Sequence, residues 1–195
     1  RDLPWRQDVK ARSEKRLDKI YHLFGDVLTK ESGAGPNSEK VLAICQKHEN
    51  EFHLPNQASQ VLHGDLNVGN VLFSLSKIVF LDFEDSVHTY LPVSVDVALI
   101  LERFFLIFEN DDKAAFQHAI NFLEGYRKSY GELPFSYNEE LKHVLLWLIL
   151  RTFCLLNAFS YAKQKWPDSE WEKYFFLYEH WSRRQALLDE INSWK

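Results

Sequence analysis

Apolar residues follow two patterns along this chain, a helical period and short continuous runs, and each pattern predicts a different kind of element. Over residues 17–28, large apolar side chains return every three or four positions, which predicts a helix with one buried face. The polar stretch before it, residues 1–8, is expected to be a connecting segment. The same helical period predicts further helices over residues 41–52, 94–108, 116–126, 138–165 and 169–194.

Short runs of Val, Ile, Leu and Phe between residues 60 and 82 predict strands instead. The first two runs flank a polar loop that contains His63, Asp65, Asn67 and Asn70, and a third run ends at Asp82. This pattern is typical of buried strands that deliver polar side chains to one edge. The next stretch, up to residue 92, is expected to be irregular. A few short strands among long helices indicate an α+β, mainly helical fold.

The polar loop has the residue types that phosphoryl transfer requires. A carboxylate must orient the attacking hydroxyl and accept its proton, and oxygen ligands must hold the Mg²⁺ that bridges the nucleotide phosphates. Asp65 can act as the base, while Asn70 and Asp82 offer an amide and a carboxylate oxygen, a sufficient protein contribution for Mg²⁺. Taken alone, Asp65 or Asn70 is better explained as a residue that caps a turn.

Four elements in a fixed order carry a resemblance to a known family. They are His63-Gly64-Asp65, Asn70 five residues after the Asp, Leu81-Asp82-Phe83-Glu84, and Val95-Asp96-Val97-Ala98. Together they resemble the catalytic signature of the aminoglycoside phosphotransferase and choline kinase superfamily, small-molecule kinases that share the protein-kinase-like fold. The resemblance implies that Asp65 is the catalytic base and that Asn70 and Asp82 are the ligands of Mg²⁺, with ATP as co-substrate.

The resemblance also implies roles for residues around the catalytic loop. His63 and Asp96 are expected to support the loop, His63 through hydrogen bonds and Asp96 from the start of a helix, where Asp is also favoured as a cap. Asn67 stands where many family members carry His, and it can contact the substrate or lie one layer behind it. Glu84 is a candidate for the same kind of role, although acidic residues that leave a strand are commonly solvated.

The family resemblance covers only the C-terminal lobe of the kinase-like fold. We expect residues 1–195 to form this lobe, with helices and catalytic-loop strands over 1–91 and a helical subdomain over 92–195. The N-terminal nucleotide lobe, with its glycine-rich loop and strand Lys, is not visible in the chain. Because the chain begins at Arg1 and contains no Met, we expect it to be part of a longer protein and to be inactive alone.

The expected function is ATP-dependent transfer of the γ-phosphoryl group to a hydroxyl of a small molecule. Candidate acceptors are an aminoglycoside, a choline-like amino-alcohol, a sugar or a related metabolite. Aromatic residues crowd the last two predicted helices, where they can form a cage for a quaternary ammonium or simply a core. The alternative is a non-catalytic kinase-like binding module that has lost turnover. A metal-dependent hydrolase is disfavoured because the cluster lacks further His and carboxylate partners.

Composition limits the class of protein and its partners. A hydrophobic content of 46% in 195 residues can bury a sizeable core, and a net charge of −5 argues against nucleic-acid and membrane-surface partners. Cys45 and Cys154 have no metal-site spacing, so reduced core residues and a cytoplasmic location are expected. The most apolar stretch, residues 144–159, carries Arg151 and predicts a buried helix rather than a membrane span.

Overall fold

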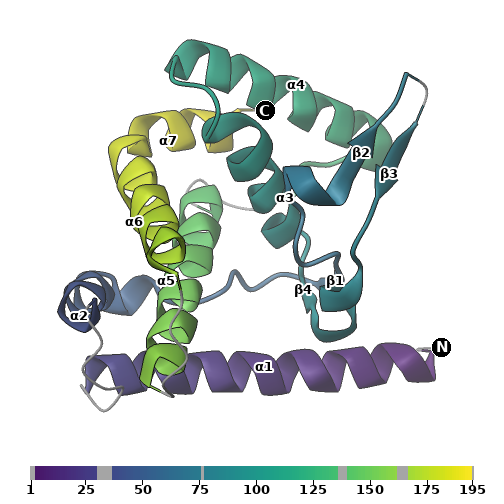
Figure 1. The fold of residues 1–195 in the computed structure, drawn as a ribbon. Helices are drawn as coiled ribbons and strands as arrows, with labels where there is room; N and C mark the ends of the chain where they lie inside the picture. Colours follow the sequence, from purple (N-terminus) through teal and green to yellow (C-terminus); the bar gives the residue numbers. More distant parts are fainter. Residues whose placement is uncertain (1–2, 30–36, 76, 136–139, 162–166, 195) are drawn as a thin grey trace.

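The computed structural model describes residues 3–29, 37–75, 77–135, 140–161 and 167–194. Within these ranges the chain forms a mainly helical α+β fold, which confirms the predicted fold class (Figure 1). The helices are α1 (Pro4–Leu28), α2 (Ser38–Lys47), α3 (Ser94–Ile100), α4 (Asp112–Tyr130), α5 (Glu140–Tyr161), α6 (Asp168–Arg183) and α7 (Gln185–Ser193). The strands are β1 (Ser59–Val61), β2 (Val71–Phe73), β3 (Ile78–Phe80) and β4 (Tyr90–Pro92).

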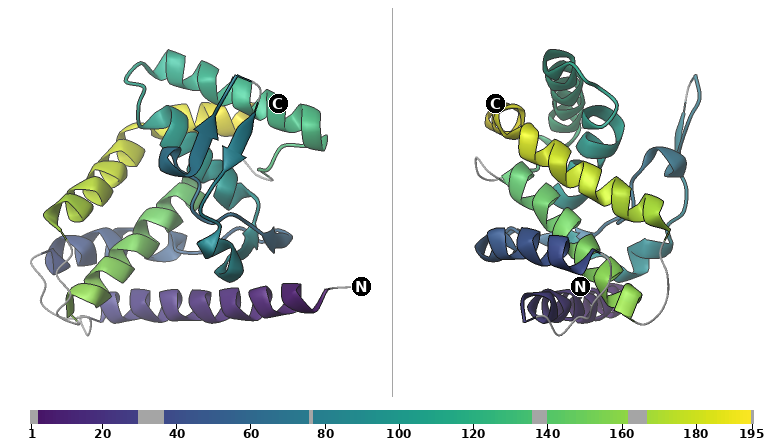
Figure 2. Two further views of the ribbon diagram at one scale, coloured as in Figure 1. Left: turned by 45° about the vertical axis from the view of Figure 1, so that its right-hand side comes forward. Right: turned by 60° about the vertical axis from the view of Figure 1, so that its left-hand side comes forward.

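Helix α5 is the centre of the hydrophobic core. It packs against α1, α2, α3, α6 and α7, and its side chains Trp147, Phe153 and Leu150 are fully buried (Figure 2). Within the described ranges, one segment, Glu140–Ala158, is long and apolar enough to cross a membrane by length and composition alone. Here that segment is enclosed by the other helices, as predicted for a buried core helix.

Most of the aromatic residues of the last helices belong to this core rather than to an open cage. Trp171, Phe175 and Trp181 of α6 are buried, and Phe175 lies 4.9 Å from the ring of Phe153. Phe176 is an exception and is exposed. The core interpretation therefore holds for these buried positions, and the other aromatics of residues 159–166 lie outside the described side chains.

The strands form two separate antiparallel pairs. β1 pairs with β4, with Val61 opposite Tyr90, and β2 pairs with β3, with Val71 opposite Phe80. The prediction that residues 83–92 are irregular is therefore wrong, because they contain β4 and the 3₁₀ helix η3 (Glu84–His88). A three-residue strand that pairs with a partner about 30 residues earlier leaves little periodic signal in the local sequence.

The β2–β3 hairpin projects from the helical body (Figures 1 and 2). The prediction of buried strands is wrong for this hairpin, since Leu72, Phe73, Ile78, Val79 and Phe80 are all exposed. Among the described residues, the inner strand position Val71 is the one hairpin side chain that reaches the core. Apolar residues in a strand indicate a surface that another group covers, and here that group is not part of the described chain.

Two helix boundaries differ from the prediction at the start of the chain. α1 begins at Pro4, so the expected connecting segment is wrong from that residue onward. Proline is favoured in the first turn, where its missing N–H costs nothing, and the buried face continues through Val9 and Ser13. The second helix ends at Lys47, and the predicted continuation to residue 52 is instead the 3₁₀ helix η1 (Glu49–Glu51).

The later helices are divided more finely than the hydrophobic period predicts. The helix expected over 94–108 consists of α3 followed by the π-helix η4 (Leu101–Leu106). The last expected helix breaks at Arg184, whose guanidinium binds the main-chain oxygens of Leu106 and Glu109 and thereby fixes the junction of α6 and α7. The helix predicted over 138–165 is described for 140–161, and its expected ends lie outside the described residues.

Candidate active site

The polar loop between β1 and β2 is shaped by two local features. Gly64 has φ = +85°, and a Cβ atom there would lie 2.6 Å from the hydroxyl oxygen of Thr89, so the position requires glycine. Asn67 caps the short 3₁₀ helix η2 (Val68–Asn70), because its Oδ1 accepts a hydrogen bond from the Gly69 N–H at 2.8 Å. These two features turn the chain tightly between the strands.

The Asp65 carboxylate is exposed and held in one orientation by two amides. Its Oδ2 accepts hydrogen bonds from Asn70 Nδ2 at 3.1 Å and from Asn67 Nδ2 at 3.2 Å, and the same two amides bond its main-chain oxygen. Among the described residues, no group donates to Asp65 Oδ1. One carboxylate oxygen is therefore fixed by the loop, and the other is available to an incoming hydroxyl.

Asp82 lies beside Asn70 in an uncommon backbone conformation. The Leu81 N–H donates to the Asn70 main-chain oxygen at 2.9 Å, which places the next residue, Asp82, against the loop. Asp82 has φ = 58° and is the one non-glycine residue with positive φ in the described ranges. Such conformations are sparsely populated and concentrate at functional sites, and Asp tolerates them better than most residues.

Asn70 and Asp82 fit the donor set of a magnesium site. The Asn70 Nδ2 group is used by Asp65, which leaves the Asn70 Oδ1 oxygen as an acceptor, and the Asp82 carboxylate is exposed without a hydrogen bond or ion pair to any described residue. The described residues contain no group of three or more His, Cys, Asp or Glu side chains that could hold a metal. One carboxylate and one amide oxygen suit Mg²⁺, which takes its other ligands from water and phosphate.

Asp96 connects α3 to the polar loop. Its Oδ2 accepts the His63 N–H at 2.8 Å, and its Oδ1 accepts the Gly64 N–H at 3.0 Å. Burial raises the pKa of the Asp96 carboxyl, while these two N–H groups act in the opposite direction. The contacts are those that a bracing residue would make, and the supporting role stays a prediction.

His63 links the same loop to the segment that leads into Asp82. Its Nε2 lies 2.7 Å from the Leu81 main-chain oxygen, so Nε2 carries the proton, and its ring lies 4.7 Å from that of Phe83. His63 Nδ1 is buried and has no hydrogen-bond partner among the described residues. This geometry favours a positioning role over a chemical one, as the sequence predicts.

Glu84 is less integrated than the other predicted site residues. It begins η3 as an exposed side chain, and it makes no hydrogen bond or ion pair with the described residues. The structure thus brings His63, Asp65, Asn67, Asn70, Asp82 and Asp96 together around one loop. Glu84 lies on the neighbouring helical turn.

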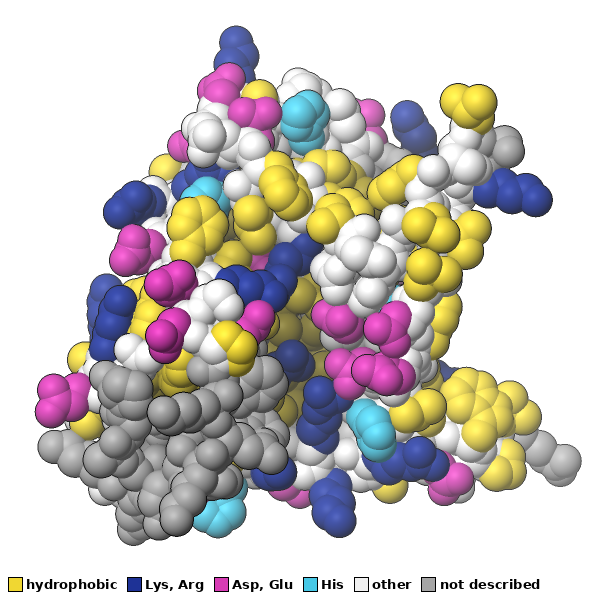
Figure 3. All heavy atoms as spheres, in the orientation of Figure 1, with side chains coloured by type: hydrophobic (Ala, Val, Ile, Leu, Met, Phe, Trp, Pro, Cys, Tyr) yellow, Lys and Arg dark blue, Asp and Glu magenta, His cyan; other side chains and the backbone are white. Residues whose placement is uncertain are grey.

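Sequence reasoning missed the contacts that helix α1 makes with the edge of this site. Arg16 of α1 forms an ion pair with Asp85 of η3 at 3.0 Å, and the buried Ser13 hydroxyl bonds both main-chain groups of Tyr90. No local sequence pattern predicts these contacts, because the two residues of each pair lie about 70 positions apart in the sequence. Exposed acidic side chains gather just below the hairpin, on one side of a hollow in this face (Figure 3).

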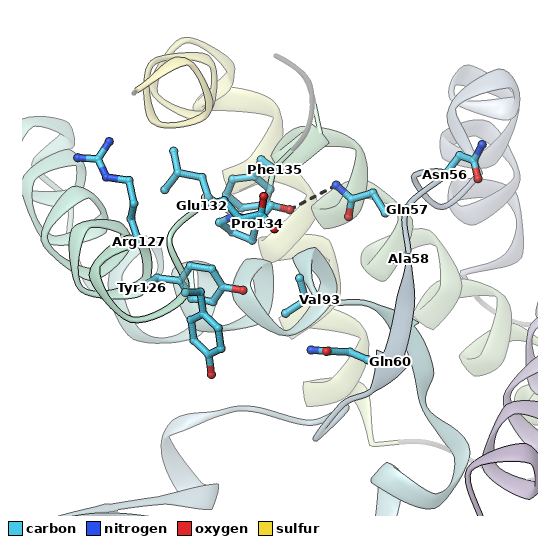
Figure 4. A pocket seen from close by; sticks show the side chains of 12 residues that line it. Asn56, Gln57, Ala58, Gln60, Val93, Tyr126, Arg127, Glu132, Pro134 and Phe135 are labelled. Carbon is cyan, nitrogen blue, oxygen red and sulfur yellow. Dashed lines mark hydrogen bonds between the residues drawn. The ribbon is translucent and has the colours of Figure 1, made fainter. Parts of the chain in front are cut away.

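One pocket lies away from the polar loop. It has a volume of about 880 Å³ and is formed by the segment around Gln57, by Val93, and by the end of α4 with the stacked rings of Tyr126 and Tyr130 (Figure 4). Gln57 Nε2 donates to the Pro134 oxygen across it at 3.4 Å. None of the predicted site residues lines this pocket.

Comparisons with known proteins identify a family for most of the chain. The model of the phosphotransferase enzyme family matches residues 3–138, which include every predicted site residue. The chain is also 31% identical over 86 residues to a protein of Methanobrevibacter smithii described as a probable bifunctional tRNA threonylcarbamoyladenosine biosynthesis protein. That match covers 43% of this chain and 15% of the relative, so the chain spans a small part of its length. No solved structure matched the chain.

Proposed function

Because the chain belongs to the phosphotransferase enzyme family, we propose that it catalyses transfer of the γ-phosphoryl group of ATP to a hydroxyl of a small molecule. The observation that carries this proposal is the Asp65 carboxylate, with Oδ2 held by two amides and Oδ1 open to solvent beside Asn70 and Asp82. Amino-alcohols, aminoglycosides, sugars and related metabolites are the candidate acceptors.

In the proposed reaction, the Asp65 Oδ1 atom orients the acceptor hydroxyl and takes its proton late in the step. The hydroxyl oxygen forms a bond to the γ-phosphorus, the bond from that phosphorus to the β–γ bridging oxygen breaks, and ADP leaves. Asn70 Oδ1 and the Asp82 carboxylate would hold Mg²⁺, which supplies charge neutralisation for the phosphate oxygens when bound. His63 and Asp96 keep the loop in place through Leu81 and through the loop N–H groups.

The exposed hairpin fits a role in nucleotide binding. Its apolar face, which includes Phe73, Ile78 and Phe80, begins one residue after Asn70 and ends two residues before Asp82. We propose that a nucleotide base and a nucleotide-binding N-terminal lobe cover this face, and that the chain alone is inactive for lack of them. We also propose a cytoplasmic protein without nucleic-acid or membrane partners, since the net charge is −5.

A role in tRNA modification, as in the description of this relative, has little support in this chain. The match covers 15% of the relative, and the exposed side chains beside the polar loop are acidic, a poor surface for a phosphate backbone. A binding module that has lost turnover is the competing proposal. It keeps the same loop geometry, so a direct assay must separate the two.

The test is phosphate transfer from labelled ATP with Mg²⁺, using the longest protein that includes this sequence and a panel of hydroxylated acceptors. We expect a labelled product, and we expect Asp65→Asn to reduce its rate by about 10²–10⁴-fold, the usual contribution of a general base. Asp18→Asn makes the same change on the exposed surface of α1 and should leave the rate unchanged. Absence of both product and Mg²⁺-dependent ATP binding would favour the binding module.

A further inference from the structure

One partly buried arginine forms no ion pair with any described residue. Arg151 belongs to the core helix α5, and its Nε atom is buried without a hydrogen-bond partner among the described residues. Its guanidinium lies 5.5 Å from the centre of the Trp147 ring, and no carboxylate of the described chain forms an ion pair with it. Buried polar groups are nearly always hydrogen-bonded, so an arginine in this state calls for an explanation.

Arg151 lies at a small cavity next to the polar loop. Burial lowers the pKa of its guanidinium and the nearby Arg16 adds to this effect, while Tyr174, Asp85 and Asp65 act in the opposite direction. Arg16 and Arg151 also line the same small cavity between α1, η3 and α5. Thr89, which lines the same cavity, lies against Gly64 of the polar loop, so the cavity borders the candidate active site.

The two arginines differ in how their charge is balanced. Arg16 is neutralised by Asp85 at 3.0 Å, and both side chains are about one-third exposed. Arg103, on the π-helix η4, is likewise paired with Glu102 at 2.9 Å. Arg151 has no such partner in the described chain, and its side chain is only partly exposed. The fold has thus retained an unpaired cation beside the polar loop.

We propose that Arg151 binds an anionic group, a carboxylate or a phosphate, of the acceptor whose hydroxyl faces Asp65. The inference rests on the proposed phosphotransferase function and names the class of its substrate. The planar guanidinium presents paired N–H donors that match carboxylate and phosphate oxygens. In Figure 3, Lys and Arg side chains lie across the hollow from the acidic group.

This assignment changes the expected acceptor. A choline-like amino-alcohol or an aminoglycoside would bring a second positive charge toward Arg151 and Arg16, and like charges at short range repel. A hydroxy acid or a hydroxylated phosphate ester would instead supply the missing counterion. The acceptor class therefore follows from the unpaired charge of Arg151. The negative net charge of the whole chain indicates nothing about the acceptor class.

The first test measures binding without ATP, so it does not depend on turnover. Glycerate and glycerol 3-phosphate are the anionic probes, with glycerol and choline as neutral and cationic controls, titrated at constant ionic strength and followed by amide NMR shifts. We expect one or both anions to bind with shifts at α5 and the polar loop, and Arg151→Gln to weaken this binding about tenfold or more. Preference between the two probes identifies the carboxylate or the phosphate as the natural group.

Two further variants separate recognition from folding. Arg183→Gln removes an equal charge from an exposed side chain of α6 and should leave anion binding unchanged. Arg151→Lys keeps the positive charge and loses only the paired N–H donors of the guanidinium, so it should fold like the wild type and bind the anion several-fold more weakly. Wild-type affinity in Arg151→Lys and Arg151→Gln would overturn the proposal. So would binding of choline as tight as that of the anions, or binding of neither anion.

The outcomes for the inference and for the parent proposal are distinct. Anion binding that requires Arg151, in a protein with neither phosphate transfer nor Mg²⁺-dependent ATP binding, would support the site and reject the enzyme. Transfer confined to neutral or cationic acceptors would support the enzyme and overturn the anion site. If Arg151→Gln weakens Mg-ATP binding and leaves the KM of the acceptor unchanged, Arg151 acts on the nucleotide and the proposal is wrong.

Discussion

At the scale of single residues, several side chains of the polar loop use one atom for a structural hydrogen bond and leave another atom available. Asn70 uses its Nδ2 to hold Asp65 and keeps its Oδ1 available, and Asp96 uses both carboxylate oxygens to hold two N–H groups. The residue types were predictable from the sequence, because they match a chemical requirement. The sequence did not predict which atom of each side chain makes which contact, since that depends on side-chain rotamers within a three-dimensional turn.

Replacement of Asp82 by Asn tests the metal assignment. Asn tolerates the positive φ of this position, so the backbone should be preserved while a charged ligand is lost. We expect the Mg²⁺-dependent affinity for ATP to fall by about 10–100-fold, measured by titration calorimetry with the longest protein that includes this sequence. Asp18→Asn is the matched control and should have no effect. Unchanged Mg-ATP affinity in Asp82→Asn would show that the metal assignment is wrong.

The buried Asp96 carboxyl predicts a pH-dependent term in stability. Its pKa is raised above the ordinary value of 3.8, so just above that pH the folded state keeps a proton that the unfolded chain has released. The unfolding free energy should therefore fall as pH rises through this window. Asp96→Asn cannot ionise and should lack this term.

The measurement for Asp96 is urea unfolding of both proteins from about pH 4 to about pH 7. The wild-type free energy minus that of Asp96→Asn should decrease as pH rises. The variant should also lose about 1–3 kcal/mol at every pH, because the amide oxygen replaces only one of the two carboxylate acceptors. Parallel pH curves, or a difference that grows with pH, would contradict the burial effect.

At the scale of elements, long helices were easier to predict than their ends and interruptions. A 3.6-residue period extends over many positions, so it can be recognised even where single residues break the pattern. The junction at Arg184 and the π-helix η4 depend instead on contacts with other segments. Strand β4 is the extreme case. Its three residues become a strand because β1 lies beside them, and nothing in the local pattern requires it.

The tight turn at Gly64 gives a test at the element scale. Gly64→Ala introduces a Cβ at a φ of +85° and 2.6 Å from the Thr89 hydroxyl oxygen, so we expect a loss of about 1–3 kcal/mol of unfolding free energy. Gly25→Ala is the matched control within α1, where nothing lies within 4 Å, and it should stabilise by about 0.5–1 kcal/mol. Equal effects in chemical denaturation would mean that the turn relaxes freely.

At the scale of the whole molecule, the described chain separates into a packed helical body and a hairpin that packs little. α5 is buried among helices from both ends of the sequence, while the hairpin side chains Phe73, Ile78 and Phe80 face outward. This asymmetry suits a surface that a nucleotide and a second lobe cover. Exposed apolar groups of this extent are uncommon on a surface without a partner.

Two nearly isosteric substitutions, one on the hairpin and one in the helical body, measure this difference in packing. Val79→Thr on the exposed hairpin should change the unfolding free energy by less than about 0.5 kcal/mol, because the new hydroxyl meets water. Val144→Thr on α5, where the side chain is fully buried, should cost about 1–3 kcal/mol for the desolvated hydroxyl. Denaturant titrations of both variants supply the comparison. A large loss for Val79→Thr would indicate that the hairpin packs in the free chain.

The sequence by itself determined the mainly helical α+β class, the buried character of α5 and the residue types of the polar loop. These features can be predicted from the period of apolar residues and from a short motif, because both depend on residues that are close together in the sequence. Only the tertiary structure decided that Asp96 reaches the N–H groups of His63 and Gly64, that the hairpin stays exposed and that Arg151 forms no ion pair with a described residue. Those outcomes depend on which distant segments meet, and packing of the whole chain sets such meetings.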